Sequence, residues 1–392
     1  MNTQPSIIRK LLDQDPKWCK AMGYTNPYLS AFKNHIYDYV VVSDGPAYDK
    51  YQALRHVYDK LWVARTQNMK CGELEELEEK EEDIKYPIFI KPRYGHLSAA
   101  SKNCFKIKNA DELKKYRGYK DMMWSDYLDG REGMTDFIVH GGNEVYQLTY
   151  LYSKDQHGFA DAWKLISPHT ECPPAIRDWL REHIRGHTGF VNIQYRAGKI
   201  IEVSLRPARG GAYIIATDNK ALIDNINDLY KYGRWDHSKA QAMQFKPYYA
   251  FKCHCRVPVM HVWPATFKKL LMKMLTPHPL FEYYFEPVGS DGVIFMQFMH
   301  PDFEAGKRAK ELIEVLFFLT QAVAMILYTL AAYVLFQPRS TARTVILVAA
   351  TLFFASRFLN PLFVNYDLYK AYRQQILGSD SLITEADRNK AV

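Results

Sequence analysis

The sequence predicts an α+β fold with antiparallel strands, followed by one or two membrane-spanning helices. Residues 122–128, 133–139 and 144–152 have strand-like composition, and the hairpin-turn sequences Asp129-Gly130 and Gly141-Gly142-Asn143 separate them. A further hairpin is predicted from residues 189–196 and 200–206. Residues 315–336 contain no charged side chain, and this length is sufficient to cross a bilayer.

The 392-residue chain divides into five predicted segments. Residues 1–85 form a short N-terminal region whose acidic run, 73–83, is either an interaction segment or a solvated linker. Residues 86–300 form a two-lobed α+β domain. Residues 312–336 form the first transmembrane helix, and residues 344–364 form a second one or an interfacial segment, because Arg357 interrupts them and Pro361 follows. Residues 365–392 form a polar tail.

Local helix signals occur at three places before the apolar C-terminal region. Residues 47–64 carry apolar side chains at helical spacing and predict one helix. Asn109 and Glu112 are placed as N-cap and third residue of another. Pro173-Pro174 opens a third helix, which Gly186 ends.

The net charge indicates which classes of partner are expected, and the cysteine content indicates the compartment. A net charge of +8 favours anionic partners such as phosphates, nucleotides or an acidic membrane surface. Because no Lys/Arg block is dense, we expect no nucleic-acid partner. The six cysteines are scattered and no apolar signal-peptide core precedes them, which predicts reduced thiols facing a cytosol-like compartment. Cys253-His254-Cys255 is either half of a metal site or a run of alternating strand residues.

The first motif that carries chemistry is YPIFIKPRYGHLSAASK, residues 86–102. A strand ends in Lys91 and is followed by a loop of small residues that includes Ser98. Backbone N–H groups in such a loop can wrap phosphates, and the lysine adds a positive charge. A lysine at the end of a strand before Pro-Arg is also an ordinary surface corner.

The second motif is MWSDYLDGREGMTDFIV, residues 123–139. It predicts a strand, a glycine turn and a second strand, with Asp126 and Glu132 close to the turn. The main chain of the first strand can hydrogen-bond adenine, and Glu132 can accept hydrogen bonds from ribose hydroxyls. The alternative is a hairpin with solvated acidic residues.

The third motif is GFVNIQYRAGKIIEVSLRPARGG, residues 189–211. Glu202, Ser204 and Arg206 alternate along one strand and therefore share a face, and Asn192 and Gln194 share a face of the preceding strand. Oxygen ligands from two adjacent strands suit Mg²⁺. Arg206 and Arg209 can hold a phosphate or a carboxylate. The alternative is the solvated face of a half-buried sheet.

The metal site imposes a condition on the hairpin register. A two-residue Ala197-Gly198 turn pairs Gln194 with Ile201 and sends Glu202 to the opposite face of the sheet. Gln194 and Glu202 therefore share a face only if the connection has an odd length or a β-bulge near Gly198 restores the parity.

Taken together and in this order, the three motifs resemble the ATP-grasp superfamily, in particular its carbamoyl-phosphate-synthetase and biotin-carboxylase branch. The resemblance covers about residues 48–213 and includes Asp49-Lys50, which looks like the Asp-Lys pair before the first helix of those enzymes. It departs from the family pattern at two places. The phosphate loop has only Gly95 where several glycines are usual, and Ser204 stands where Asn is expected.

The resemblance implies a two-lobed ATP-grasp-like domain and a role for each matching residue. Implied phosphate ligands are Lys50, Lys91 and the loop containing Ser98; implied adenine and ribose contacts are Ser125, Asp126, Tyr127, Leu128 and Glu132; implied ligands of Mg²⁺, or Mn²⁺ in its place, are Gln194, Glu202 and Ser204; implied catalytic residues are Arg206 and Arg209.

The implied activity is that of a membrane-anchored ligase. ATP activates a small-molecule carboxylate as an acyl phosphate, and an amine or similar nucleophile attacks it. The alternative is a membrane protein that keeps the fold and the nucleotide site without turnover. Lys/Arg residues flank both apolar stretches on their outer sides, so a hairpin in the lipid with the large domain in the cytosol is predicted. The sequence predicts neither the substrate nor an oligomeric state.

Overall fold

The computed structural model describes residues 40–79, 84–97, 103–116, 118–154, 156–157, 160–257, 263, 265–275, 281–282, 286–287, 293–335, 345 and 348. These residues form two compact units. The first unit contains the described residues of 40–154 and 164–247, and the second contains those of 156–163 and from 248 onward. Both are built from helices and antiparallel strands, so the chain is α+β as predicted. The predicted domain boundaries at residues 85 and 300 stay predictions.

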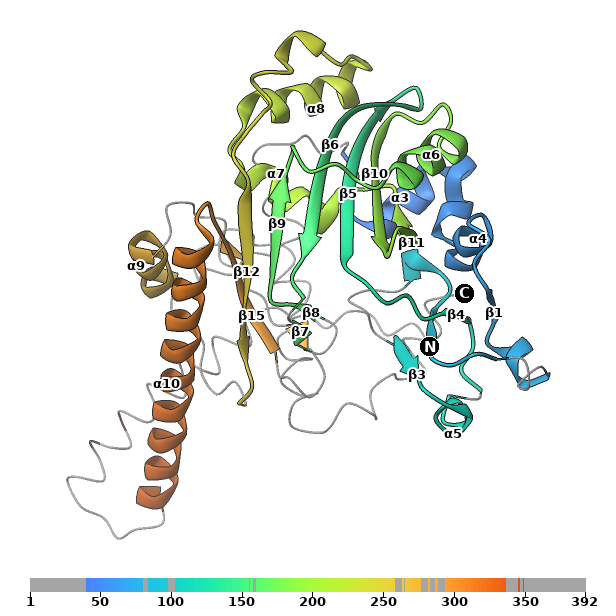
Figure 1. Ribbon diagram of the computed structural model, residues 1–392. Helices are drawn as coiled ribbons and strands as arrows, with labels where there is room; N and C mark the ends of the chain where they lie inside the picture. Colours follow the sequence, from blue (N-terminus) through green and yellow to red (C-terminus); the bar gives the residue numbers. More distant parts are fainter. Residues whose placement is uncertain are drawn as a thin grey trace. The chain divides into compact units, whose positions relative to one another are not determined.

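The first unit contains a small antiparallel sheet, visible beside α5 in Figure 1. Its strands, in sheet order, are β1 (Cys71–Glu73), β4 (Met122–Asp126), β2 (Ile88–Pro92) and β3 (Phe105–Ile107). Helix α5 (Ala110–Lys114) follows β3, and the Asn109 side chain accepts from the amide of Glu112 at 2.9 Å. The predicted N-cap is therefore confirmed. Leu74 and Leu77, which flank or interrupt the acidic turn η2 (Glu75–Glu79), pack in the core of this sheet.

The first unit also contains five neighbouring strands of a larger antiparallel sheet (Figure 1). These strands, in sheet order, are β11 (Lys199–Ser204), β10 (Gly189–Arg196), β5 (Glu132–His140), β6 (Asn143–Tyr152) and β9 (Trp163–Ser167). The predicted hairpin turns occur where Gly141, Gly142 and Gly198 adopt positive φ angles, which glycine tolerates without steric cost.

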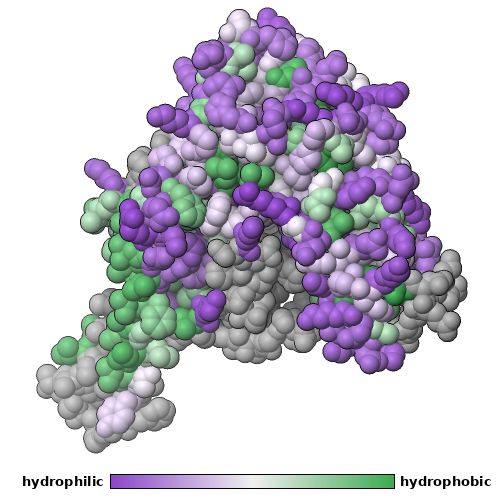
Figure 2. All heavy atoms as spheres, viewed as in Figure 1, coloured by the Kyte–Doolittle hydropathy of each residue, from purple (hydrophilic) through white to green (hydrophobic). Residues whose placement is uncertain are grey.

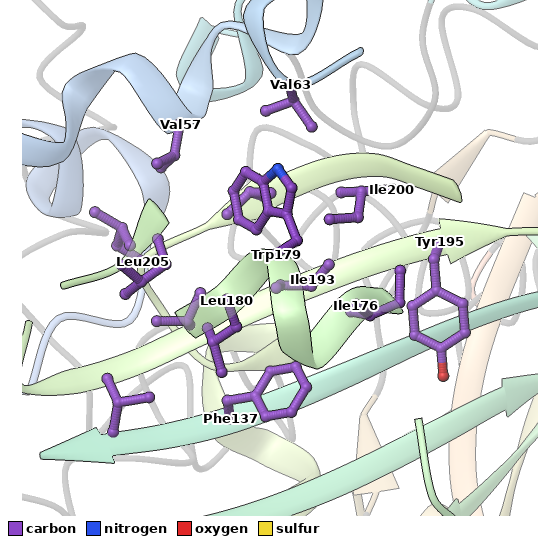
Figure 3. Close-up of a cluster of buried hydrophobic side chains, with 14 of the residues drawn as sticks. Val57, Val63, Phe137, Ile176, Trp179, Leu180, Ile193, Tyr195, Ile200 and Leu205 are labelled. Carbon is purple, nitrogen blue, oxygen red and sulfur yellow. The ribbon is translucent and has the colours of Figure 1, made fainter. Parts of the chain in front are cut away.

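One face of this larger sheet is apolar and is covered by helices. Residues of three adjacent strands, among them Phe137, Ile193 and Ile200, pack in one cluster with Trp179 and Leu180 of α6 (Pro174–His183), as Figure 3 shows. Burying these side chains stabilises the unit, because each removes apolar surface from water. An aromatic side chain removes roughly 150–250 Å², and an aliphatic one removes less. The opposite face of the same strands carries polar side chains.

Residues 47–64 are largely helical, as predicted, but they do not form a single helix. The chain instead forms α3 (Asp44–Lys50), the 3₁₀ helix η1 (Gln52–Tyr58) and α4 (Lys60–Arg65). The break before α4 has a clear cause: Asp59 is extended, and its carboxylate accepts from the amides of Leu61 and Trp62 and binds Arg93. An aspartate in that conformation caps a new helix rather than continuing the old one.

The other elements of the first unit are helices. They are η4 (Gly95–Leu97), η5 (Ala208–Gly211), α7 (Ala212–Ala216), α8 (Lys220–Tyr232) and η6 (His237–Lys239). Helix α8 begins at Asn219, whose side chain accepts from the amide of Leu222, and ends at Gly233 with φ +64°. These are standard helix boundaries for an Asn N-cap and a glycine in the left-handed region.

The second unit is built on β12 (Tyr248–Cys255) and β15 (Val293–His300), which pair antiparallel. Its other elements are β7 (Gln156–His157), β8 (Ala160–Asp161), α9 (Ala265–Leu275), β13 (Phe281–Glu282), β14 (Glu286–Pro287) and α10 (Phe303–Leu335). Cys253 and Cys255 are free thiols in its apolar core. Within the described residues no group of three or more His, Cys, Asp or Glu side chains is placed to hold a metal ion.

Candidate functional site

The polar face of the larger sheet is the candidate site. Asn192, Gln194 and Arg196 of β10 pair with Asp136, Met134 and Glu132 of β5, so all six side chains leave the same face. The residues between them, such as Ile193 and Phe137, point to the apolar face and pack under α6. The alternation therefore separates a core face from a face that carries carboxylate, amide and guanidinium groups.

A β-bulge places Glu202 on this polar face. Gln194 pairs with Glu202, whereas the next residue, Tyr195, pairs with Ile200, so Ile201 is the extra residue of β11. Asn192 pairs with Ser204 in the same register. The parity condition derived from the sequence is thus fulfilled, although the bulge lies at Ile201 rather than beside Gly198.

Two buried lysines reach β11 from other elements. Lys91, on β2, is 9% exposed and its Nζ donates to the carbonyl of Ile201 at 2.6 Å. Lys60, the first residue of α4, is 5% exposed and its Nζ lies 3.5 Å from Oε2 of Glu202. Burial, with the nearby charge of Lys60, lowers the pKa of Lys91 to about 8, although Glu202 opposes the shift. Two buried lysines therefore lie near the partly exposed carboxylate of Glu202, and Glu132 also acts on Lys91.

The loop after β2 packs against the same carboxylate. Gly95 is buried, and a Cβ at this position would lie 3.6 Å from Oε1 of Glu202 and 3.6 Å from Cε of Lys60. The single glycine of the predicted phosphate loop therefore lies where the loop approaches Glu202. Ser98 lies outside the described residues.

The predicted adenine and ribose contacts lie at the end of β4, in the residues after it and at the start of β5. The amides of Asp126 and Tyr127 donate to the carbonyls of Lys70 and Pro87. Among the described residues the amide of Leu128 has no hydrogen-bond partner, so it is the main-chain donor available at the end of this strand. Glu132 accepts from the side chains of Gln194 and Arg196, which fixes its carboxylate on the polar face.

A buried aspartate that the sequence analysis missed organises the far end of β11. Asp136 is 1% exposed and accepts from the Tyr150 hydroxyl at 2.6 Å, from Nδ2 of Asn192 at 2.7 Å and from the amide of Ala208 at 2.9 Å. Burial raises its pKa to about 6. Asp136 therefore ties the segment after β11 to the sheet. Its position four residues after Glu132 was the available signal, because residues at even spacing share a strand face.

The two predicted catalytic arginines lie in or beside this segment. Nε and one terminal nitrogen of Arg206 donate to Oδ2 of Asp44 at 3.1 and 2.8 Å, so α3 holds the guanidinium. Arg209 adopts φ 51° and ψ 35°, a left-handed conformation that costs a non-glycine residue about 1–2 kcal/mol. Such strain is concentrated at functional sites.

Lys60 lies where the sequence analysis expected Lys50. The Nζ of Lys50 lies over the rings of Tyr51 and Tyr230, at 5.5 and 5.7 Å from their centroids. Tyr230 accepts from the amide of Phe190, at the opposite end of β10 from Arg196. The sequence contains two Asp-Lys pairs, and it is the second, Asp59-Lys60, that directly precedes a helix and reaches Glu202.

The residues of the site fit a magnesium ion by their chemistry. Gln194 uses its amide nitrogen on Glu132, which leaves its oxygen as a potential ligand. Glu202 is partly exposed at 31% and contributes a carboxylate. Ser204, which pairs with Asn192, contributes a hydroxyl. Hard oxygen ligands of this kind are those that Mg²⁺ prefers.

Comparisons with known proteins give structural likenesses only. No family model matches the sequence, and no curated protein matches it significantly. Among solved structures, L-amino acid ligase from Bacillus licheniformis is 13% identical, with a TM-score of 0.48 over 66% of this chain and 71% of that chain. N5-carboxyaminoimidazole synthase from Aspergillus clavatus, in complex with ADP and 5-aminoimidazole ribonucleotide, is 15% identical, with a TM-score of 0.46 over 68% and 74%.

A third likeness is phosphoribosylamine–glycine ligase from Thermotoga maritima, which is 15% identical, with a TM-score of 0.44 over 70% of this chain and 75% of that chain. With TM-scores of 0.48 or below, these likenesses assign neither a family nor an activity to the chain. The functional assignment depends on the residues of the polar face.

Proposed function

We propose that this chain is an ATP-grasp-type ligase that binds ATP and Mg²⁺ on the polar face of the larger sheet. In the proposed reaction a carboxylate is activated as an acyl phosphate and an amine or similar nucleophile displaces the phosphate. The observation that carries the proposal is the pair of buried lysines, Lys60 and Lys91, around Glu202. Buried cations beside a solvent-accessible carboxylate suit a ligand with phosphate groups and a divalent cation.

Each part of the site has a proposed task. Lys91 and Lys60 bind the phosphates, and the hinge of residues 125–128 receives the adenine through the amide of Leu128. Glu132 contacts the ribose while Gln194 and Arg196 hold its carboxylate in place. Gln194, Glu202 and Ser204 would hold the metal ion, which when bound neutralises phosphate charge.

Arg206 and Arg209 are proposed to act on the transferring phosphoryl group and the carboxylate substrate. A guanidinium offers parallel N–H donors that match a carboxylate or phosphate. Asp44 restricts Arg206 to one orientation, and Asp136 holds the backbone of the same segment through Ala208. The protein thus contributes positioning and charge neutralisation, which are the main requirements of phosphoryl transfer.

The proposed function predicts ADP release that depends on both substrates. Full-length protein in detergent is incubated with ATP, Mg²⁺ and pools of amino acids and small carboxylates, with or without an amine pool. We expect release above background only when a carboxylate is present, and nucleotide binding by calorimetry in every mixture. A protein that neither binds nor hydrolyses ATP under these conditions contradicts the proposal.

A nucleotide-binding membrane protein without turnover is the second candidate. Ser204 favours it, because this residue replaces the expected Asn and is 2% exposed. A short, buried hydroxyl reaches less far than an amide toward a metal ion. Nucleotide binding without ADP release in any mixture supports this candidate over the ligase.

We also propose that α10 attaches the protein to a membrane. Residues 303–330 form one helix long and apolar enough to span a bilayer. The helix has two faces: Ala309, Ile313 and Phe317 are buried in the second unit, whereas many apolar side chains are exposed, as Figure 2 shows along this helix. These exposed residues include Leu312, Val315, Phe318, Leu319, Val323, Met325, Ile326 and Leu330. Such a face suits contact with lipid.

The predicted hairpin remains part of this proposal. Of residues 344–364 only Val345 and Val348 are described, so the second span lies almost wholly outside the described residues. The first helix begins at Phe303 rather than at residue 312. The proposed orientation, with the large domain in the cytosol, agrees with the supply of ATP.

Membrane attachment is tested by placing charge on the exposed face of α10. Val323→Asp with Ile326→Asp is expected to release the full chain from phosphatidylcholine vesicles in a flotation assay, since each aspartate costs about 2.5–3.5 kcal/mol near the centre of a span. Both side chains are more than half exposed, so folding should be retained. Leu270→Asp, at an equally exposed position on α9, is the control and should leave flotation unchanged. Equal flotation of all variants contradicts the proposal.

A further inference from the structure

Two polar atoms, one on α3 and one on η4, are buried without a hydrogen-bond partner among the described residues. They are Oδ1 of Asp44 and Nδ1 of His96. The other oxygen of Asp44 already accepts both bonds from Arg206. Because an unpaired buried polar atom costs free energy, its presence indicates a group that joins it in the functional state.

The two side chains lie on one side of α3. Asp44 and Tyr48 are one helical turn apart and therefore share a face of that helix. The ring of Tyr48 stacks on His96, with centroids 3.7 Å apart and planes at 10°. The carboxylate of Asp44 also acts on His96, because it partly opposes the burial that lowers the pKa of the imidazole.

Aromatic rings hold His96 in place. Tyr58 meets both Tyr48 and His96 edge-on, with centroids 5.7 and 5.8 Å away. The guanidinium of Arg55 lies 4.7 Å from the centroid of Tyr48. Stacking therefore holds the imidazole, while its Nδ1 has no hydrogen-bond partner among the described residues.

Asp44 and His96 are each adjacent to a residue of the proposed ligase site or to a neighbour of such a residue. Gly95, which precedes His96, packs against Glu202 and Lys60. Asp44 binds Arg206. Asp44 is thus bonded to the guanidinium proposed to hold the activated substrate, and His96 directly follows the glycine that packs against the carboxylate proposed to hold Mg²⁺.

We propose that Asp44 and His96 form the subsite for the amine nucleophile of the ligase reaction, an inference that rests on the proposed function. A neutral primary amine, or ammonia, has two or more N–H donors and one lone pair. Donation of one N–H to Oδ1 of Asp44 and another to Nδ1 of His96 leaves the lone pair free to attack. Two acceptors at fixed positions would therefore both bind and orient the nucleophile.

The second half-reaction transfers the acyl group from the phosphate to the amine. The nitrogen lone pair forms the C–N bond with the acyl carbon, the bond from that carbon to the phosphate oxygen breaks, and the phosphate leaves with the electron pair. The proton lost by the nitrogen moves to Nδ1 of His96. Asp44 keeps its bonds to Arg206 throughout.

A base of this kind must be neutral before the reaction. Burial, Arg55 and Lys60 lower the pKa of His96 from its ordinary value of 6.5, while Asp44 and Asp49 oppose the shift. Tyr48, Tyr58 and Tyr94 are the other titratable groups against the ring. The imidazole is therefore neutral at pH 7, and the amine-dependent rate should fall as the pH is lowered through the His96 pKa.

Binding is tested without turnover on the full chain, labelled with ¹⁵N-histidine, in detergent. The probe is methoxyamine, which is neutral near pH 7, and the matched control is N,N,O-trimethylhydroxylamine, which has no N–H donor. His96→Phe keeps an aromatic ring against Tyr48 and identifies the His96 resonance by its loss. We expect methoxyamine alone to shift the Nδ1 resonance saturably, and Asp44→Asn to weaken binding about tenfold through loss of a charge-assisted hydrogen bond.

Kinetics separate the two roles. His96→Phe should lower kcat of amine-dependent ADP release roughly 100-fold and remove its acidic pH limb, as expected for loss of a general base. Asp44→Asn should raise KM for the amine, and His96→Phe should leave nucleotide affinity unchanged. His56→Phe, whose ring meets Trp62 instead, is the control and should behave as wild type.

The outcomes distinguish this inference from the proposed function. An unshifted His96 resonance in a chain that binds nucleotide overturns the amine subsite and leaves the nucleotide site standing. Equal shifts with both probes, or unchanged affinity in Asp44→Asn, also overturn it. A saturable shift with methoxyamine alone supports the subsite even in a chain that fails to bind ATP, in which case only the proposed function is wrong.

Discussion

Replacing Glu202 with Gln is expected to abolish Mg²⁺-dependent nucleotide turnover, with a loss of roughly 100-fold or more. Glu202 provides the only formal negative charge among the three proposed metal ligands. The bulge at Ile201 places this carboxylate opposite Gln194, and Lys60 lies 3.5 Å from it. The measurement is ADP release across a Mg²⁺ titration, combined with calorimetry of nucleotide binding with and without the metal.

A control on folding is necessary, because Glu202→Gln leaves Lys60 buried without its opposite charge. The thermal unfolding midpoint of the variant should be compared with that of the wild type. Glu171→Gln removes an exposed carboxylate that pairs with Arg177 and should leave the Mg²⁺ dependence unchanged. A Glu202→Gln protein with the wild-type response to Mg²⁺ would eliminate the proposed metal site.

Strands and hairpins were predictable because their signals are local. Turn sequences such as Gly141-Gly142 and alternating side chains are confined to a few residues, and the predicted strand at residues 189–196 coincides with β10 (Gly189–Arg196). The helical region predicted over residues 47–64 is divided into three elements for the opposite reason. Asp59 breaks it by binding Arg93, which is 34 positions away in the sequence. The spacing of apolar residues does not reveal a partner that is distant in the sequence.

The same distinction applies to the candidate site. Alternation predicts that Glu202 and Ser204 share a face, and the register condition identifies the need for a bulge. The choice between Lys50 and Lys60 depends on the path of the chain before β1, which two identical Asp-Lys pairs do not reveal. Asp44 and His96 escape prediction altogether, because only tertiary burial gives them unpaired atoms.

Hydropathy likewise describes composition rather than partners. The apolar run that predicts a membrane span belongs to α10, yet Ile313 and Phe317 of this helix pack in the core of the second unit. Phe317 stacks on Phe295, with ring centroids 3.8 Å apart. A sequence average cannot separate a face that packs on β15 from a face available to lipid.

Lys91→Met is expected to change nucleotide affinity and folding stability in opposite directions. The charged amine is buried, and its pKa is lowered to about 8 mainly by that burial, so the folded protein carries a destabilising charge at pH 7. Methionine has a similar length without the charge. After allowance for the lost bond to the Ile201 carbonyl, the variant should be about 1–2 kcal/mol more stable without ligand. Nucleotide affinity should fall roughly tenfold or more, because a phosphate-binding charge is lost.

The difference in unfolding free energy between Lys91→Met and the wild type should depend on pH. In the wild type the unfolded lysine stays protonated up to its ordinary pKa of 10.5, whereas the folded one loses its proton from about pH 8. The unfolded state therefore binds more protons in this window, and the free energy of unfolding rises with pH there. Lys91→Met lacks this contribution, so its stability advantage should shrink between pH 8 and 10.5.

Affinity should show the matching trend. Binding of a phosphate group favours protonated Lys91, so wild-type nucleotide affinity should decline as the pH rises through about 8, while that of Lys91→Met should decline less. Lys85→Met, at an exposed position just before β2, is the matched control and should alter neither quantity. Denaturant unfolding and calorimetry at several pH values provide the measurements. A variant that is less stable than the wild type at pH 7, yet binds nucleotide equally well, would show that Lys91 is a structural residue and that the phosphates bind elsewhere.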